Sequence, residues 1–98
     1  MTSNKDMACA ATASDYDKAC NTAIASTPTG DGMVQVCING LLVSVGDGIR
    51  TKDCYFSADG SAARAIADIV AGDFLYWVGS VAGWQLLTTD VVSFIYAV

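Results

Sequence analysis

Residues 33–46, MVQVCINGLLVSVG, alternate between apolar and other side chains on both sides of an Asn39-Gly40 pair. Asn-Gly is the preferred pair for a two-residue type I′ turn, because both central residues of that turn have positive φ angles. Closing this loop places three apolar pairs on one face: Ile38 with Leu41, Val36 with Val43, and Val34 with Val45. The opposite face then carries four residues: Gln35, Cys37, Leu42 and Ser44. The pattern predicts a β-hairpin with one buried face.

Four further stretches have the length and composition of short strands, with Gly and Asp turn signals between them: 54–58, 74–78, 84–87 and 91–98. In the last stretch four residues form one face of the strand: Val92, Phe94, Tyr96 and Val98. Residues 61–70, SAARAIADIV, fit either one helix capped by Ser61 or a loop followed by a strand. Strands at a spacing of roughly ten residues predict a mainly β fold, as a small β-sandwich or a jelly-roll-like barrel.

The first thirty residues differ from the rest, because they contain no valine, leucine, phenylalanine or tryptophan. They fit either a mobile tail or a short helix capped by Ser14. The helix would place four residues on one face: Tyr16, Cys20, Ala23 and Ile24. So small an apolar stripe needs a surface to lie on, in its own domain or in a neighbour. We therefore expect an extended or part-helical N-terminal arm, residues 1–30, and a β-domain, residues 31–98.

Residues 75–87, LYWVGSVAGWQLL, hold both tryptophans and no charged side chain. They predict two strands around a turn from Gly79 to Gly83. Trp77 and Trp84 then have two alternative roles, because large aromatic side chains dominate both small cores and ligand-stacking surfaces. Core packing is the first interpretation and a ligand-facing role is the second.

Charge and targeting signals exclude several function classes. The net charge is −5, and the five basic residues are scattered singly along the chain. We expect no nucleic-acid binding and no attraction to an anionic membrane, because no basic patch is present in the sequence. The N-terminus lacks the apolar segment of a secretory signal, and the apolar runs are shorter than the ~20 residues of a membrane-spanning helix. We expect a soluble protein made in the cytoplasm.

The sequence lacks the residues that most catalytic and metal sites need. It has no histidine, so a histidine-based triad and imidazole metal ligands are excluded. The glycines match no phosphate-binding motif. Oxygen-rich loops at 29–32 and 45–50 offer calcium ligands, although their spacing matches no EF-hand and turns account for them equally well. We expect no enzymatic activity, no cofactor and no resident metal.

Four cysteines are spaced too widely for a CxxC metal site: Cys9, Cys20, Cys37 and Cys54. Buried free thiols are the first interpretation, because a disulfide framework requires an oxidising compartment. The alternative pairs Cys9 with Cys20 and Cys37 with Cys54.

Three motifs follow one another from residue 33 to the end: VxVxINGxxVxVGDGI, then CYFSADG…AR, then GDFLYWVGSVAGWxLxxxDxxxFxYxV. In this order they resemble small structural proteins of tailed-bacteriophage virions. In those proteins the last motif commonly reads GDxLYWNGSxAGxxL, followed by DxIxFxY. This chain departs from that pattern at Val78, which replaces the asparagine. It departs again at residues 91–93, which are less polar and favour a strand covered by a partner.

The resemblance implies a virion protein, either a head or tail appendage or a capsid decoration (cement) protein. A decoration protein of this kind binds the major capsid protein and stabilises the assembled head. The resemblance also implies a dimer or trimer on the capsid surface, made in the host cytoplasm. The alternative is a host-glycan-binding module of a head or tail fibre, with Tyr76, Trp77 and Trp84 stacking on sugar rings. We expect six residues to contact partners: Tyr16, Cys20, Ile24, Trp77, Trp84 and Tyr96.

Overall fold

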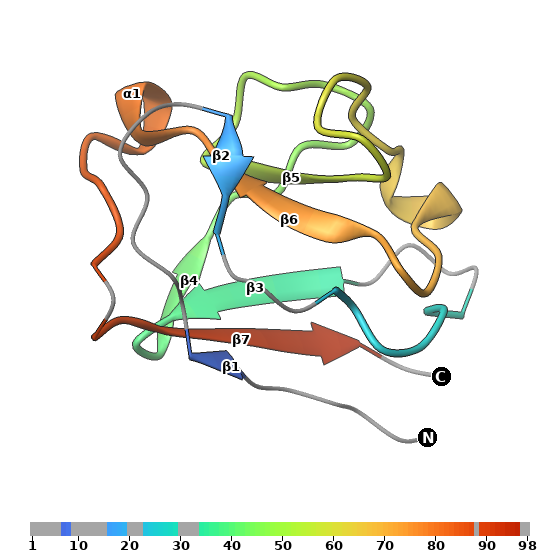
Figure 1. Ribbon diagram of the computed structural model, residues 1–98, viewed down its shortest axis with the longest axis horizontal. Coiled ribbons are helices and arrows are strands. Elements are labelled where there is room, and N and C mark those ends of the chain that lie inside the picture. Colours follow the sequence, from blue (N-terminus) through green and yellow to red (C-terminus); the bar gives the residue numbers. More distant parts are fainter. Residues whose placement is uncertain (1–6, 9–15, 20–22, 30–33, 88, 97–98) are drawn as a thin grey trace.

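The computed structural model describes residues 7–8, 16–19, 23–29, 34–87 and 89–96. These residues form seven strands, one short α-helix and one 3-10 helix: β1 Met7–Ala8, β2 Asp17–Lys18, β3 Val34–Ile38, β4 Leu41–Val43, β5 Cys54–Ser57, η1 Ile66–Asp68, β6 Phe74–Trp77, α1 Gly79–Ala82 and β7 Val91–Tyr96. The strands make two antiparallel sheets, with the orders β1–β7–β3–β4 and β2–β6–β5 (Figure 1). The fold is thus mainly β, as the sequence predicts. No helix in these ranges has the length and apolar character needed to cross a membrane.

The predicted hairpin is present as β3 and β4. Asn39 and Gly40 have φ angles of 53° and 86°, the positive values that a type I′ turn requires. Two of the three predicted pairs are confirmed: Val36 with Val43 and Ile38 with Leu41. The strand alternation therefore determined this register correctly from the sequence.

The third predicted pair, Val34 with Val45, does not form, because β4 ends two residues before Val45. Val34 pairs instead with Tyr96 of β7 on the other side of β3. Val45 forms an isolated parallel bridge with Cys54, and the Gly46 amide donates to the Cys54 carbonyl at 2.7 Å. This bridge joins the two sheets along one side.

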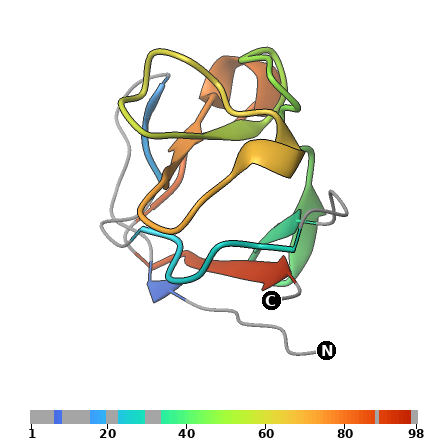
Figure 2. The same ribbon diagram turned by 90° about the vertical axis from the view of Figure 1, so that its right-hand side faces the viewer.

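One apolar core lies between the two sheets, which face each other in Figure 2. Phe56 of β5 and Phe94 of β7 meet edge to face across it, with ring centroids 5.4 Å apart. The face predicted along residues 91–98 is found at its described positions, since Val92, Phe94 and Tyr96 are all buried. Trp77 is fully buried in the same core, which confirms core packing for this tryptophan.

A second, smaller apolar layer covers the outer side of sheet β2–β6–β5. It contains Tyr55, Tyr76 and Val78, against which Ala63 and Phe74 pack. Both faces of β5 are therefore covered, and its four residues are all buried. This explains why 54–57, CYFS, lacks the polar alternation of a half-exposed strand.

Residues 61–70 form no α-helix, and only Ile66–Asp68 take a 3-10 turn. Contacts with distant residues hold this segment in an irregular path. The Arg64 amide donates to the Phe56 carbonyl at 2.8 Å, and the Ile66 amide donates to Asp47 Oδ1 at 2.8 Å. Neither interpretation from the sequence is fully correct, because residues 61–70 form a loop as the second one expects but contain no strand. The separately predicted strand that follows is β6.

The strand predicted at residues 84–87 is absent, because α1 replaces the predicted turn. Gly83 ends α1 with a φ angle of 91°, a left-handed value that glycine adopts without steric cost. Gly79 lies so close to the Gln85 side chain that a Cβ atom there would clash with it. The Trp77 indole Nε1 donates to the Trp84 carbonyl at 2.9 Å and fixes the segment that follows.

The described parts of the first thirty residues pack on both sheets. β1 pairs with β7, and β2 pairs with β6 (Figure 1). Ala19 and Ile24 are buried in the main core. The helix predicted from Ser14 is wrong where the structure describes it, because residues 17–18 form a strand and residues 23–29 have no regular structure. Ser14 and Cys20 lie outside the described residues, and the domain boundary at residue 30 stays a prediction.

Candidate functional site

The outer face of sheet β1–β7–β3–β4 has no charged side chain among its described positions on β3, β4 and β7. We call these six residues the uncharged face: Gln35, Cys37, Leu42, Val91, Ser93 and Ile95. Cys37 pairs with both Leu42 and Ser93, so these three residues lie side by side across three strands. The apolar members are well exposed, with 59% of Leu42, 47% of Val91 and 36% of Ile95 accessible. Such a face favours burial against another apolar surface.

Hydrogen bonds of the Asn39 and Asp90 side chains fix one end of the uncharged face. The Asn39 amide Nδ2 donates to Asp90 Oδ1 at 2.9 Å, and the Val91 amide donates to Asn39 Oδ1 at 2.8 Å. The Leu87 amide donates to Asp90 Oδ2 at 2.8 Å. These hydrogen bonds lower the pKa of Asp90 below its usual value, with the Leu87 amide contributing most. The hairpin turn is therefore held against the start of β7.

A pocket of about 330 Å³ lies beside the loop after β5 and is lined mainly by alanines. Asp59, Arg64 and Asp68 are its charged residues. Asp59 Oδ1 accepts hydrogen bonds from the amides of Ser61 at 2.8 Å and Ala62 at 3.3 Å. Arg64 turns toward Asp73, with its Nε 3.0 Å from Asp73 Oδ2. Asp59 and Arg64 thus stabilise the loop itself.

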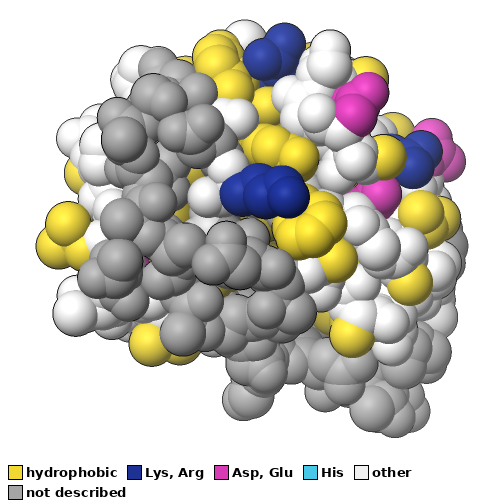
Figure 3. Space-filling model, viewed as in Figure 1, with side chains coloured by type: hydrophobic (Ala, Val, Ile, Leu, Met, Phe, Trp, Pro, Cys, Tyr) yellow, Lys and Arg dark blue, Asp and Glu magenta, His cyan; other side chains and the backbone are white. Residues whose placement is uncertain are grey.

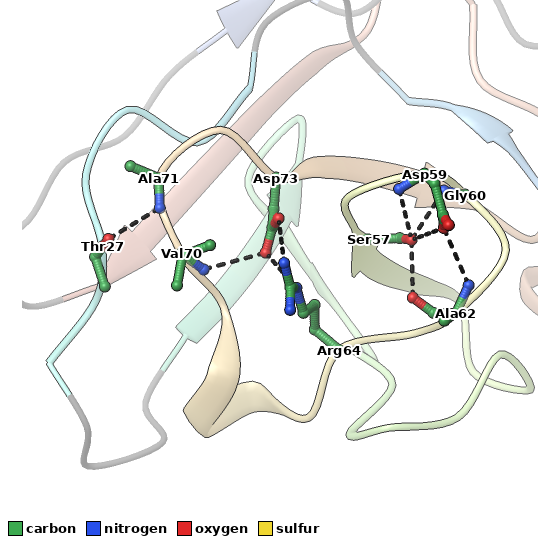
Figure 4. A network of polar contacts seen from close by, with 9 residues as sticks. All are labelled: Thr27, Ser57, Asp59, Gly60, Ala62, Arg64, Val70, Ala71 and Asp73. Carbon is green, nitrogen blue, oxygen red and sulfur yellow. Dashed lines mark hydrogen bonds and ion pairs between the residues drawn. The ribbon is translucent and has the colours of Figure 1, made fainter.

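Figure 4 shows how Ser57 and Asp73 organise the same region. Ser57 Oγ accepts from the Gly60 amide and donates to the Ala62 carbonyl, both at 2.8 Å. The Val70 amide donates to buried Asp73 at 3.1 Å. The Ala71 amide donates to Thr27 Oγ1 at 3.0 Å, which ties this segment to the N-terminal residues. The amides of Ser61 and Ala62 and the Ser57 hydroxyl lower the pKa of Asp59.

We expect the protein to lose stability as the pH falls below about 4, through Asp59 and Asp90. Both carboxyl groups have a lower pKa in the folded state than their ordinary value of 3.8. Their stabilisation is therefore present above the unfolded-state pKa and is lost as the pH falls through the folded-state pKa. Urea unfolding between pH 6 and pH 2 measures the loss. The double variant D59N/D90N should depend less on pH in this window, and an unchanged slope would refute the assignment.

The structure separates the residues that the sequence suggested as partner contacts. Ile24, Trp77 and Tyr96 lie in the core, so their side chains are not available at the surface of this structure. Tyr16 and Trp84 are partly exposed but lie in different places. Trp84 packs on Trp77 with ring centroids 5.0 Å apart, whereas Tyr16 packs near Tyr55 on the outer side of sheet β2–β6–β5. Cys20 lies outside the described residues.

Sequence reasoning did not select three exposed residues of the uncharged face: Leu42, Val91 and Ile95. For Leu42 the signal was present, because the hairpin register places it opposite the buried face. Val91 and Ile95 alternate with the buried residues of β7 and are found in the same way once β7 is identified.

The two described cysteines are free and differ in their surroundings. Cys54 is buried, its Sγ donates to the Ser44 carbonyl at 3.3 Å, and burial raises the pKa of its thiol far above the usual range. Cys37 is half-buried on the uncharged face. The alternative Cys37–Cys54 disulfide therefore does not form, while Cys9 and Cys20 lie outside the described residues.

The described residues contain no group of three or more His, Cys, Asp or Glu side chains that could hold a metal ion. Of the two candidate calcium loops, Asp47 in 45–50 accepts a hydrogen bond from the Ile66 amide. Residues 30–32 of the other loop lie outside the described residues. Comparison with family models, with curated proteins and with solved structures finds no match to the chain.

Proposed function

We propose that the protein is a non-enzymatic structural protein of a tailed-bacteriophage virion, a capsid decoration protein that binds the major capsid protein on the assembled head. The motifs in residues 33–98 and the uncharged face support this function. The proposal includes a finer description of the fold, in which the two sheets are the halves of a small β-sandwich. It also includes a dimer or trimer on the capsid surface.

The uncharged face is the observation that carries the proposal. The buried centres of protein interfaces are depleted of charged residues, because burying an unpaired charge costs free energy. The face offers exposed Leu42, Val91 and Ile95 around Cys37 and Ser93, whose smaller side chains leave room for a partner. The sheet is a better contact than the first thirty residues, because Ala19 and Ile24 are already used inside the core.

Binding to this face is sufficient for the function, and no reaction is needed. A protein that binds the assembled shell and not its free subunits shifts the equilibrium toward the shell by mass action. Each tenfold rise in free protein above the dissociation constant adds about 1.4 kcal/mol per site. Because many copies bind one head, the total stabilising free energy is large.

Val91→Lys should abolish binding to capsids without unfolding the protein. The substitution places an unpaired charge within the proposed interface, so we expect binding to weaken by at least about a hundredfold. Val81 of α1 provides a matched control, because both valines are 47% exposed. Sedimentation with shells of the phage that encodes this chain measures binding. Equal binding by Val91→Lys and Val81→Lys would remove the uncharged face from the proposal.

Cys37 supplies a second measurement of the same contact. Its thiol should be alkylated in the free protein and protected when the protein is bound to shells, and peptide mapping distinguishes it from the other cysteines. Cys54 should stay unmodified in both states, because it is buried. Alkylation of Cys37 at the same rate in both states would contradict a contact at this face.

The alternative function, a glycan-binding module using Tyr76, Trp77 and Trp84, receives less support from the structure. Trp77 is fully buried, and Tyr76 is 7% exposed. Only Trp84 presents part of its ring at the surface, and one ring is a small platform for a sugar.

A further inference from the structure

Cationic side chains lie over aromatic rings on the outer side of sheet β2–β6–β5. The Arg50 guanidinium carbon is 4.2 Å from the centroid of the Tyr16 ring and 5.6 Å from that of Tyr55. Lys18 Nζ is 3.9 Å from the centroid of the Phe74 ring. Figure 3 shows Lys or Arg side chains against hydrophobic side chains in the region of β2 and β6. We call Tyr16, Lys18, Arg50 and Phe74 the cation–aromatic face.

Two buried tyrosines form a rigid base under this face. Lys18 pairs with Tyr76, and Tyr76 pairs with Tyr55, so the three residues form one row across the sheet. The two tyrosine rings stack with centroids 5.5 Å apart and an angle of 15° between their planes. Tyr55 Oη donates to the Gly60 carbonyl at 2.8 Å, and a Cβ atom on Gly60 would meet the Tyr76 ring at 2.8 Å. The base is therefore fixed by close packing.

Tyr16 is held over this base in an unfavourable backbone conformation. Its φ angle is 67°, which is uncommon for any residue other than glycine and rare for a large aromatic one. Its amide donates to the Trp77 carbonyl at 2.8 Å, and the residue remains 40% exposed. Backbone strain of this kind is concentrated at binding and catalytic sites. The strained backbone of Tyr16 presents a partly exposed side chain beside the Arg50 guanidinium, and this arrangement favours a role in binding.

The Arg50 side chain is partly enclosed by the protein. Its Nε atom is buried and has no partner in the structure, although most buried donors in proteins are paired. The protein as a whole carries a net charge of −5, yet this face presents a guanidinium and an ammonium group over aromatic rings. The guanidinium and the ammonium group are positive partners for an anionic group of a ligand. Asp59 also lies near, since burial and then the Asp59 charge raise the pKa of Tyr76 beneath this face.

We propose that the cation–aromatic face binds an acidic saccharide, whose sugar rings carry carboxylates. The apolar face of a sugar ring packs on the exposed ring of Tyr16, while its carboxylate pairs with the planar guanidinium of Arg50. Lys18 offers a second positive charge further along the sheet. An acidic protein segment would use the two charges and leave the ring of Tyr16 without a role. The site lies on the opposite side of the core from the uncharged face, and it does not rest on capsid binding.

Titration with trigalacturonate, alginate trimer and sialic acid trimer at low salt tests the proposal on the full chain. We expect at least one to bind with a dissociation constant on the order of 0.1–1 mM, and we expect its methyl ester to bind about tenfold more weakly. Tyr16→Asn should weaken binding about tenfold and leave the fold intact, because asparagine tolerates a positive φ angle. Arg50→Gln should have the same effect on binding. Lys52→Gln removes an equal charge outside the face and should change binding less than about twofold.

Three results would overturn the proposal. In the first, none of the trimers binds at about 10 mM, a concentration that saturates even a weak site. In the second, a methyl ester binds as well as its acid, which would exclude recognition of the carboxylate. In the third, a hexa-aspartate peptide binds as tightly as the best saccharide and Tyr16→Asn has no effect, which would assign the face to an acidic protein segment. Because the two sites are separate, Tyr16→Asn should leave binding to capsids in the sedimentation assay unchanged. Failure of the saccharide proposal is thus distinguishable from failure of the capsid-binding proposal.

Discussion

A chain that begins at residue 29 will not fold, and its circular dichroism and amide spectra will be those of an unfolded chain. The deletion removes Ile24 and Ala19 from the core, where they are 1% and 0% exposed. It also removes β2, which covers one edge of β6. Truncating one buried isoleucine to alanine costs about 2–5 kcal/mol, while a domain of this size has a total stability of about 5–15 kcal/mol. The free energy lost with one strand and two core residues therefore exceeds the stability that the remaining fold provides.

Backbone hydrogen bonds add to this loss. The Ala19 amide donates to the Leu75 carbonyl at 2.8 Å, and the Ile24 amide donates to the Asp73 carbonyl at 2.9 Å. The Gly72 amide in turn donates to the Ile24 carbonyl at 3.0 Å. Deleting residues 1–28 leaves the Leu75 and Asp73 carbonyls and the Gly72 amide without their partners, and unpaired backbone groups are costly where water does not reach them.

Two control proteins test whether the loss of folding is specific to residues 7–28 or follows from any shortening or core substitution. A chain that begins at residue 7 keeps β1, β2 and the core residues, and it should unfold at nearly the same urea concentration as the full chain. Ile24→Ala should be folded but less stable by about 2–5 kcal/mol. A truncated chain from residue 29 with a dispersed amide spectrum would instead show that the boundary at residue 30 separates an independent folding unit.

The parts of the fold that the sequence predicted are those where one local signal determines the structure. Asn39-Gly40 dictates the turn of the hairpin, and the turn then dictates its register. Along β7 the two-residue period of a strand places Val92, Phe94 and Tyr96 on one face, and this face is the buried one. In both cases neighbouring residues in the chain contain all the information that is needed.

The wrong predictions arise where distant contacts override local pattern. Residues 84–87 have strand composition, but α1 and the hydrogen bond from Trp77 to the Trp84 carbonyl hold them in another path. Residues 61–70 have a helical pattern, but Arg64 bonds to Phe56 and to Asp73 instead. Both outcomes depend on which strand lies next to which segment, and the spacing of residues along the chain does not reveal this.

The two candidate surfaces were likewise predictable only where a local sequence signal determines them. The register of the hairpin places Leu42 and Cys37 on the face away from the core, so half of the uncharged face was predictable. The cation–aromatic face brings Tyr16 and Arg50 together from segments far apart in the chain, and no sequence motif links them. The sequence analysis also assigned Ile24 to a partner contact, because a segment poor in apolar residues gives no sign that the core uses it.

Removing Arg64 should destabilise the protein more than removing its partner does. The Asp73 side chain is 3% exposed, and Arg64 Nε lies 3.0 Å from its Oδ2. Arg64→Met leaves a buried carboxylate with only the Val70 amide as a described hydrogen-bond donor to its side chain. Breaking a fully buried ion pair in this way costs about 3–5 kcal/mol, and the 36% exposure of the Arg64 side chain reduces the expected cost to about 2–3 kcal/mol. The melting temperature should fall by about 10–20 °C.

The reverse substitution is milder, because Arg64 can turn to water whereas Asp73 cannot. Asp73→Asn keeps an oxygen that accepts from the Val70 amide and should cost about 1 kcal/mol. The double variant R64M/D73N should be more stable than Arg64→Met alone, because it no longer buries a charge, and the cycle should show a coupling energy of about 1–2 kcal/mol. Calorimetry of the four proteins tests this order. If Arg64→Met melts within a few degrees of the wild type, the Asp73 carboxylate is stabilised by water and not by the arginine. The loop from residue 61 to residue 73 would then depend on Ile69 in the core and on the Asp73–Ile24 backbone pair to hold its path.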